Sequence, residues 1–277
     1  MKSKFSLVLG VFSVVLFSCT DIDLDVSEEK EVIEILGQSM QSPESDEAIE
    51  IANTVIDEYL ATMPVKINGI NKVSAMVAKP VVELISEKGV FPESYVIDFG
   101  DGYYMNSKNK TISGKIYFTK SDKVGTFRTY RFYEFYIDKT NIKSYRTIER
   151  KDEIKEGNEL KISASDTVTF ANGSSYLRKW ERTRKLIGSN GNVTEYWNNS
   201  YEYEGSGSGT TLKKTKYEMK IQKPLVSLAG YKYYVSGVVM VKAETGEQFI
   251  DFGKGEKDNI ATVKTNGKEK EVKLDWE

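Results

Sequence analysis

The spacing of turn residues over the last two thirds of the chain constrains the fold more than any other feature. From Tyr95 onward, turns that contain Gly, Asn or Asp separate runs rich in Tyr, Phe, Thr, Val and Ile, about every ten residues. These residue types favour strands, and short strands joined by such turns are typical of antiparallel sheets. We therefore predict an α+β protein that is mainly antiparallel β sheet over residues 95–277, with an N-terminal helical segment packed on the sheet.

The individual strands follow from the same pattern. The predicted strands are 115–119, 126–137, 142–149, 166–171, 176–187, 193–204, 211–221, 235–241, 248–252, 261–265 and 268–274. Asn266-Gly267 favours a type I′ turn between the last two strands. In contrast, Gly205-Ser-Gly-Ser-Gly209 is predicted to be a flexible loop inside the β domain, because Gly/Ser-rich segments are flexible.

Residues 42–94 are predicted to form the helical segment. Ser42 followed by Pro43 is typical of a helix N-terminus. Apolar residues then recur at three- and four-residue intervals, as on one face of a helix, at Ala48, Ile49, Ala52, Val55, Ile56, Tyr59, Leu60 and Met63. Within 65–92, the apolar run divided by Pro80 fits either a strand and a helix or two short helices. A further short helix is predicted from Glu28 to Leu36, ending at Gly37.

One phrase occurs twice in the β region, as Ile97-Asp98-Phe99-Gly100-Asp101-Gly102 and as Ile250-Asp251-Phe252-Gly253-Lys254-Gly255. A strand that ends in an aspartate and two glycines predicts a tight turn, so the phrase indicates two related β units. Asp98, Asp101 and Asp251 then have two interpretations. They cap the turns by accepting backbone N–H groups, which we favour, or they contribute to a calcium site, although no EF-hand spacing is present.

The segment around Asn190-Gly191 predicts a hairpin with an unusual face. If these two residues form the turn, Arg184 lies opposite Trp197 and Trp180 lies opposite Tyr201. One face then carries a candidate ligand platform, which consists of Trp180, Arg184, Trp197, Tyr201 and Tyr203. Such a platform suits a sugar or a peptide. The alternative, which we favour, is that these residues are ordinary strand formers whose arginines stack on aromatic rings beneath a neighbouring sheet.

The first eighteen residues are predicted to be an export signal. Lys2 and Lys4 precede the apolar run Phe5–Phe17, which is too short to span a bilayer. The end of this run overlaps the sequence Leu16-Phe17-Ser18-Cys19. The Leu-x-Ser-Cys sequence resembles the lipobox of bacterial lipoproteins. This resemblance implies that Cys19 is diacylated, becomes the mature N-terminus and anchors the chain in a membrane. The alternative is an ordinary secretory peptide that is cleaved beside the same cysteine.

Residues 19–41 are predicted to be an acidic tether that contains the short helix. Five acids follow the lipidated cysteine within ten residues, at Asp21, Asp23, Asp25, Glu28 and Glu29. A run of like charges is solvated and repels itself. An acidic run in this place also resembles the surface-export signal of Bacteroidota lipoproteins. We therefore expect the protein at the outer membrane, facing outward.

Composition excludes several function classes. The chain has no histidine and a single cysteine, so Ser-His-Asp triads, Cys-His pairs, His-containing zinc sites and disulfides within the chain are excluded. Loss of Lys2 and Lys4 leaves 37 basic against 41 acidic residues, a net charge of −4, which disfavours a nucleic-acid partner. We expect no metal and no cofactor. Three function classes remain: a binding or structural envelope protein, a glycan-binding lipoprotein of an uptake system, and a carboxylate-dependent glycoside hydrolase.

The order of several short motifs resembles a family of Bacteroidota cell-envelope lipoproteins with paired Asp-Phe-Gly-x-Gly turns. The motifs are the two repeated phrases, Gly114-Lys115-Ile116, Tyr145-Arg146-Thr147-Ile148, Pro224-Leu225-Val226, Val235-Ser236-Gly237, Asp258-Asn259 and Ala261-Thr262-Val263. The resemblance covers roughly residues 95–274 and implies fold and location, but no activity. Family members carry cysteines near these turns, where this chain has Tyr103, Tyr104 and Lys257. In addition, Asp166-Thr167-Val168 resembles the O-glycosylation site of Bacteroidota exported proteins.

Overall fold

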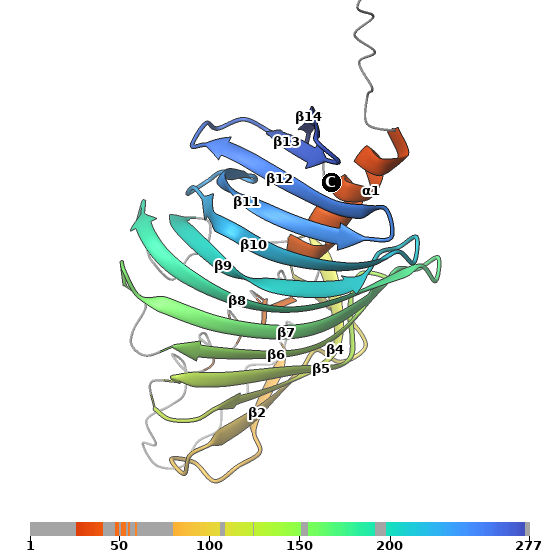
Figure 1. Cartoon of the computed structure of the whole chain (residues 1–277). Helices are drawn as coiled ribbons and strands as arrows, with labels where there is room; N and C mark the ends of the chain where they lie inside the picture. The colour runs from red at the N-terminus through yellow and green to blue at the C-terminus, as the bar shows by residue number, and fades with distance from the viewer. Residues whose placement is uncertain are drawn as a thin grey trace, which may run out of the picture.

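The structure is a computed structural model whose body is one strongly curved antiparallel sheet (Figure 1). It describes residues 26–40, 48–49, 51–53, 55, 59, 80–105, 109–123, 125–150, 155–191 and 198–274. The predicted signal peptide, Cys19 and the acids at 21, 23 and 25 lie outside the described residues. The prediction of a mainly antiparallel β protein is confirmed.

The sheet has fourteen strands, and α1 (Val26–Met40) precedes them in the chain. The strands are β1 (Val81–Leu84), β2 (Glu93–Asp98), β3 (Tyr103–Met105), β4 (Lys110–Lys120), β5 (Phe127–Ile137), β6 (Thr140–Arg150), β7 (Glu159–Thr169), β8 (Ser175–Ser189), β9 (Asn199–Thr210), β10 (Lys216–Ser227), β11 (Tyr234–Ala243), β12 (Gly246–Lys254), β13 (Ile260–Thr265) and β14 (Lys268–Lys273).

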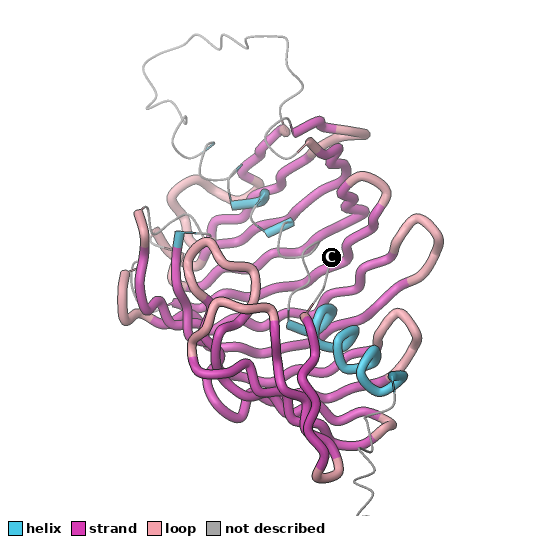
Figure 2. The backbone as a smooth tube through the Cα atoms, turned by 90° about the horizontal axis from the view of Figure 1, so that it is seen from above, coloured by secondary structure: helices cyan, strands magenta, loops and turns pink. Residues whose placement is uncertain are grey.

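Chain order and sheet order nearly coincide. From β4 to β14 each strand pairs with the next strand in the sequence, while β2 pairs with β1 and β4, and β3 pairs with β4 at the side of this path. Seen from above, the strands form one continuous wall (Figure 2). Such a meander needs only short turns, as the regular turn spacing predicts. Asn266 and Gly267 both have positive φ, 49° and 76°, so the type I′ turn between β13 and β14 is confirmed.

Several sequence-based boundaries are wrong, since the strands predicted at 166–171 and 211–221 are β7 (Glu159–Thr169) and β10 (Lys216–Ser227). The sheet begins at β1, inside the segment 42–94 that was expected to be helical. The stretch Gly205–Gly209 is not a loop but part of β9, hydrogen-bonded to β8 and β10. Glycine weakens a strand by itself, but cross-strand pairing on both sides supplies the missing stabilisation.

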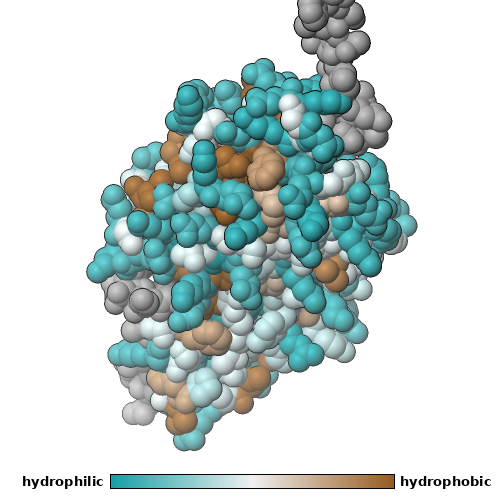
Figure 3. Space-filling model, viewed as in Figure 1, coloured by the Kyte–Doolittle hydropathy of each residue, from teal (hydrophilic) through white to brown (hydrophobic). Residues whose placement is uncertain are grey.

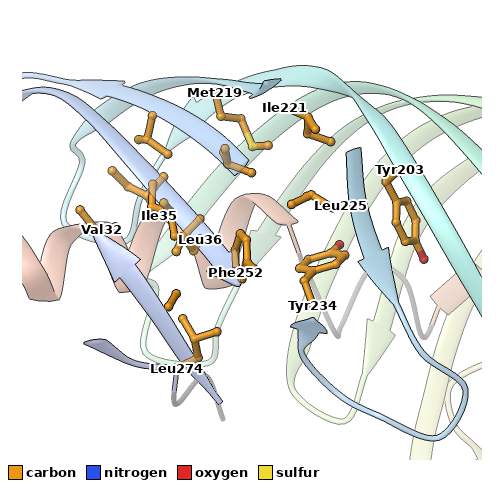
Figure 4. Close-up of a cluster of buried hydrophobic side chains, with 14 of the residues drawn as sticks. Val32, Ile35, Leu36, Tyr203, Met219, Ile221, Leu225, Tyr234, Phe252 and Leu274 are labelled. Carbon is orange, nitrogen blue, oxygen red and sulfur yellow. The ribbon is translucent and has the colours of Figure 1, made fainter. Parts of the chain in front are cut away.

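The sheet has an inner face, which carries the buried side chains, and an outer face, which is exposed to solvent. α1 contributes Val32, Ile35 and Leu36, all fully buried, to an apolar cluster with side chains of β8 to β14. Figure 4 shows these three helix side chains directed toward the sheet side chains of that cluster. The helix continues through Gly37 to Met40, beyond the predicted end, because its contacts with the sheet outweigh the low helix propensity of glycine.

A second apolar cluster lies on the inner face of β2 to β6. The described residues of the segment 42–63 that belong to this cluster are helical, and Ala48, Ile49, Ala52 and Val55 are buried. The Tyr130 hydroxyl donates to the Asn53 side-chain oxygen at 2.6 Å, which joins this segment to β5. The two apolar clusters thus cover the two ends of the sheet, and the strands between them carry the polar residues described next.

Candidate functional site

Between the two apolar clusters, the inner face of β6 to β8 carries a buried charged cluster. Its members are Ser144, Arg146, Asp166, Arg178, Trp180 and Arg182. Strand register brings them together, because Ser144, Asp166 and Arg178 are successive cross-strand partners and Arg146 lies in the next row with Trp180. Side chains in such rows point to the same face of a sheet. We call these six residues the inner charged cluster.

Asp166 is the centre of the inner charged cluster and is fully buried. The Ser144 hydroxyl donates to its Oδ1 at 2.5 Å, and Nη2 and Nε of Arg178 donate to its Oδ2 at 2.7 and 3.1 Å. Nη2 of Arg146 lies 3.3 Å from the same Oδ2. Burial alone would raise the pKa of Asp166, but the two guanidinium groups and the hydroxyl hold that pKa well below its usual range.

Trp180 is surrounded by arginines. The guanidinium carbons of Arg182, Arg146 and Arg178 lie 4.6, 5.3 and 5.3 Å from its ring centroid, within the range of cation–π attraction. The Trp180 indole is only 6% exposed. Trp180 also packs on Ile162 and Ala164, so stacked cations and aliphatic side chains both fill the interior between the two apolar clusters.

The predicted platform residues that the structure describes lie close together, but inside the protein. Tyr201 and Tyr203 are 4% and 5% exposed, and their ring centroids are 6.0 Å apart. The Arg184 guanidinium lies 4.5 Å from the Tyr201 ring centroid. Arginines stacked on buried rings match that part of the alternative interpretation, but these residues lie on the inner face of the one described sheet and not beneath a neighbouring sheet. Trp197 lies outside the described residues.

The predicted register of this hairpin is wrong by six residues. Arg184 pairs with Tyr203 instead of Trp197, and Ser189 pairs with Asn199, so Asn190-Gly191 is not a two-residue turn. Because six is even, every side chain remains on its predicted face. The true register places Gly205, Gly207 and Gly209 opposite Arg182, Trp180 and Arg178 in the same order.

These three glycines allow the neighbouring strands to approach the backbone of β9 closely. A Cβ at Gly207 would lie 2.9 Å from the Lys179 carbonyl oxygen, closer than real Cβ atoms come, and 3.1 Å from the Trp180 Cβ, which is tighter than most real contacts. At Gly209 a Cβ would collide with the Leu177 carbonyl oxygen and the Tyr217 ring. Backbone carbonyls of β8 and the Tyr217 ring of β10 therefore lie against the backbone of β9.

The two buried acids of the described residues, Asp166 and Glu93, are poorly suited to acid catalysis. The Tyr95 hydroxyl donates to Glu93 at 2.7 Å, and Lys120 Nζ lies 2.9 Å from the same carboxylate. Burial would raise the pKa of Glu93, but these two partners lower it overall. Glycoside hydrolysis needs a carboxylic acid that stays protonated near neutral pH, and both of these groups are kept ionised.

The repeated phrases form capped turns at opposite ends of the sheet. The Gly100 N–H donates to Asp98 Oδ1 at 2.8 Å, and the Gly253 N–H donates to Asp251 Oδ1 at 3.0 Å. Asp98 also forms an ion pair with Lys115 at 2.8 Å, and the hydrogen bond from Lys115 lowers the pKa of Asp98. Asp101 is exposed. The capping interpretation is confirmed for Asp98 and Asp251, and the described residues hold no group of three acids arranged for a metal ion.

The two phrases also share their surroundings. Each phenylalanine is buried in its own apolar cluster, Phe99 beside β4 and Phe252 beside β11. Each aspartate pairs with the residue that follows a bulged glycine, Gly114 or Gly237. The chain order is reversed, however, because β2 precedes its glycine-bearing partner whereas β12 follows its own. The repeat therefore marks equivalent positions in the sheet and not a tandem copy of one unit.

The outer face carries an exposed aromatic site that the sequence analysis missed. Tyr117 of β4, Arg131 of β5 and Tyr145 of β6 are successive cross-strand partners, and Tyr133 lies two residues after Arg131 on the same face. Tyr117 is 39% exposed, Tyr133 is 50% exposed and Tyr145 is 53% exposed. We call these four residues the outer tyrosine patch. Figure 3 shows the molecule from the outer side, with pale residues of intermediate hydropathy over the lower strands.

The outer tyrosine patch makes few contacts of its own. Within the described part of the chain, Arg131 forms no ion pair or hydrogen bond, and the three tyrosine rings contact no other ring. Large aromatic side chains on a rigid, solvent-exposed sheet face are typical of binding surfaces. This patch, rather than the buried residues around Trp180, is the candidate functional site.

Comparison of the chain with protein-family models, with curated proteins and with solved structures finds no match. Among the described residues, no helix has the length and apolar character needed to cross a bilayer.

Proposed function

We propose that this chain is a lipid-anchored cell-envelope protein that binds a ligand and performs no catalysis. The observation that carries the binding role is the outer tyrosine patch, in which three exposed tyrosines flank Arg131, an arginine with no ion-pair partner among the described residues. The lipobox resemblance of residues 16–19 supports the anchor on Cys19. The acidic residues that follow it support a location at the outer membrane with the folded body facing outward.

The proposed architecture places the helical segment on the inner face and leaves the outer face for the ligand. The buried positions Ala48 and Ala52 support packing of that segment on the sheet. The inner charged cluster is then a structural element that holds the two apolar clusters together. A glycoside hydrolase is not favoured, because Asp166 and Glu93 are both kept ionised.

The lipid anchor is tested by metabolic labelling. Cells that express the full chain are grown with radiolabelled palmitate, and the label is expected in the wild-type protein and in the membrane fraction. Cys19→Ala should lose the label and release the protein from the membrane. An unlabelled wild-type protein would refute the anchor, and saturable chemical turnover by the purified mature protein would refute a purely binding role.

Modification of the Asp166-Thr167-Val168 tripeptide is a separate proposal. Asp166 is fully buried and Thr167 is partly buried in β7, so a glycosyltransferase could reach this tripeptide only before the sheet forms. Intact mass of the native protein tests it, since attached sugars add mass to the acylated chain.

A further inference from the structure

The outer tyrosine patch has the dimensions of a short oligosaccharide. Neighbouring strands lie about 4.8 Å apart, so Tyr117 and Tyr145, which flank β5, have Cα atoms about 10 Å apart with Arg131 between them. Tyr133 is about 7 Å from Arg131 along β5. Three exposed tyrosines therefore flank Arg131 on a surface as wide as about two sugar units.

A row of hydroxyl groups borders the patch. This row lies two residues along the strands from the row that contains Tyr117, Arg131 and Tyr145. It consists of four successive cross-strand partners, Thr119, Thr129, Thr147 and Ser163. Thr119 exchanges a hydrogen bond with Ser94 at 3.1 Å. The hydroxyls of Thr129, Thr147 and Ser163 form no side-chain hydrogen bond with other described residues. Hydroxyls both donate and accept hydrogen bonds, as a polyhydroxylated ligand requires.

The charge of this surface selects the ligand further. Lys115 is neutralised by Asp98, whereas Arg131 and the exposed Lys143 have no ion-pair partner within the described residues. Two exposed acids balance these cations: Glu134 at the bulge of β5, and Glu83, which lies in the same cross-strand row as Tyr117 and Arg131. The central charge is a guanidinium, which binds a carboxylate through two parallel hydrogen bonds.

We infer that the outer tyrosine patch binds a glycan that carries carboxylate groups, with Arg131 on a uronate and the tyrosines stacked on the sugar faces. This inference rests on the proposed binding role and names its ligand class. A second copy of the chain is a poorer occupant. Two-fold packing with the axis at the centre of this face would place the two Arg131 side chains against each other, and like charges opposed across an interface are unfavourable.

The test uses the mature lipidated protein in detergent micelles and two matched probes. The probes are a hexamer of galacturonate and the same hexamer with its carboxylates methyl-esterified, and calorimetry measures their affinities. The acidic hexamer should bind at least about tenfold more tightly than its ester, the value of one charge-assisted hydrogen-bonded pair. Equal affinities for the two probes would overturn the assignment of a carboxylate ligand.

Four variants locate the site. Arg131→Gln should weaken binding of the acidic hexamer at least about tenfold, and Tyr145→Ala about fivefold. Lys179→Gln is the matched charge control, since Lys179 is exposed on the same face of β8. Phe249→Ala is the matched aromatic control, since Phe249 is 40% exposed on β12. Both controls should remain within about twofold of wild type, and equal losses in Arg131→Gln and Lys179→Gln would overturn the inference.

The remaining outcomes separate this inference from the proposed function. If neither hexamer binds while Cys19 still carries palmitate, the ligand class is wrong and the lipid-anchored location stands. Binding that requires Arg131 but is seen only with vesicles of anionic lipid, or only with an acidic protein, also overturns the glycan assignment. If palmitate is absent but the acidic hexamer binds through Arg131, the anchor is wrong and the inference stands.

Discussion

Asp166→Asn is the substitution that most directly tests the role of the inner charged cluster. The change keeps the side-chain volume and removes the negative charge that faces Arg178 and Arg146, which are 1% and 4% exposed. Removing one partner from a buried ion pair costs about 3–5 kcal/mol, because the remaining charge stays buried. For a chain of this size, that loss corresponds to a melting temperature lower by about 10 °C.

The assay is urea unfolding of the mature protein followed by tryptophan fluorescence. Asp101→Asn is the matched control, because Asp101 is exposed and forms no side-chain hydrogen bond or ion pair with other described residues. Its free energy of unfolding should stay within about 0.5 kcal/mol of wild type. If Asp166→Asn is as stable as Asp101→Asn, the carboxylate does not hold the cluster together, and the reasoning from burial and ion pairing is refuted.

The same carboxylate gives a pH dependence with a defined sign. The folded protein lowers the pKa of Asp166, so its stabilising contribution is complete above the unfolded-state value of about 4. That contribution is lost as pH falls from about 4 toward the lower folded-state pKa. The difference in unfolding free energy between wild type and Asp166→Asn should therefore be constant from pH 5 to 7 and shrink below about pH 4. A difference that grows in acid would contradict this linkage.

Three further predictions concern packing. Gly209→Ala should lower the free energy of unfolding by about 1–3 kcal/mol or more, because the new Cβ would collide with the Tyr217 ring. Gly188→Ala is the control for thermal unfolding and should be tolerated, because its Cβ would lie 4.0 Å from the nearest atom. Tyr217→Phe should leave stability unchanged or higher by up to about 1 kcal/mol, since the buried hydroxyl has no hydrogen-bond partner in the described structure; a clear loss in chemical unfolding would reveal an unseen partner. Ile35→Ala should cost about 2–5 kcal/mol, and a loss below 1 kcal/mol would show that α1 is loosely docked.

The hairpin around Trp180 shows how much of the interior follows from the sequence. Alternation along β8 placed Arg178, Trp180, Arg182 and Arg184 on one face, and the structure agrees. The register with β9 did not follow, because a Gly-Ser repeat carries no apolar pattern that could fix it. The need for glycine at position 207 comes from the close approach of β8 to the β9 backbone, which only the packing of the strands can reveal.

The candidate binding site was missed for a related reason. Strand β5 has aromatic residues at both odd and even positions, in the sequence Phe-Arg-Thr-Tyr-Arg-Phe-Tyr-Glu-Phe-Tyr-Ile. Alternation therefore cannot separate inner from outer tyrosines. A bulge resolves it, since Glu134 adopts φ 46° and returns Phe135 to the inner face, where its ring lies 5.0 Å from that of Phe132. Tyr133 is thereby left exposed on the outer face.

Local chemistry in the sequence determined the succession of strands and turns, the Asn266-Gly267 turn and the aspartate caps of the repeated phrase, and it predicts the lipid signal. Each of these depends on residues a few positions apart, whose conformational preferences act before any tertiary contact forms. The tertiary structure alone decided the register of β8 on β9, the burial of Trp180 and the exposure of Tyr133. Those features depend on which strands pair with each other. The free energy of burial that stabilises them comes from contacts between side chains that are far apart in the sequence.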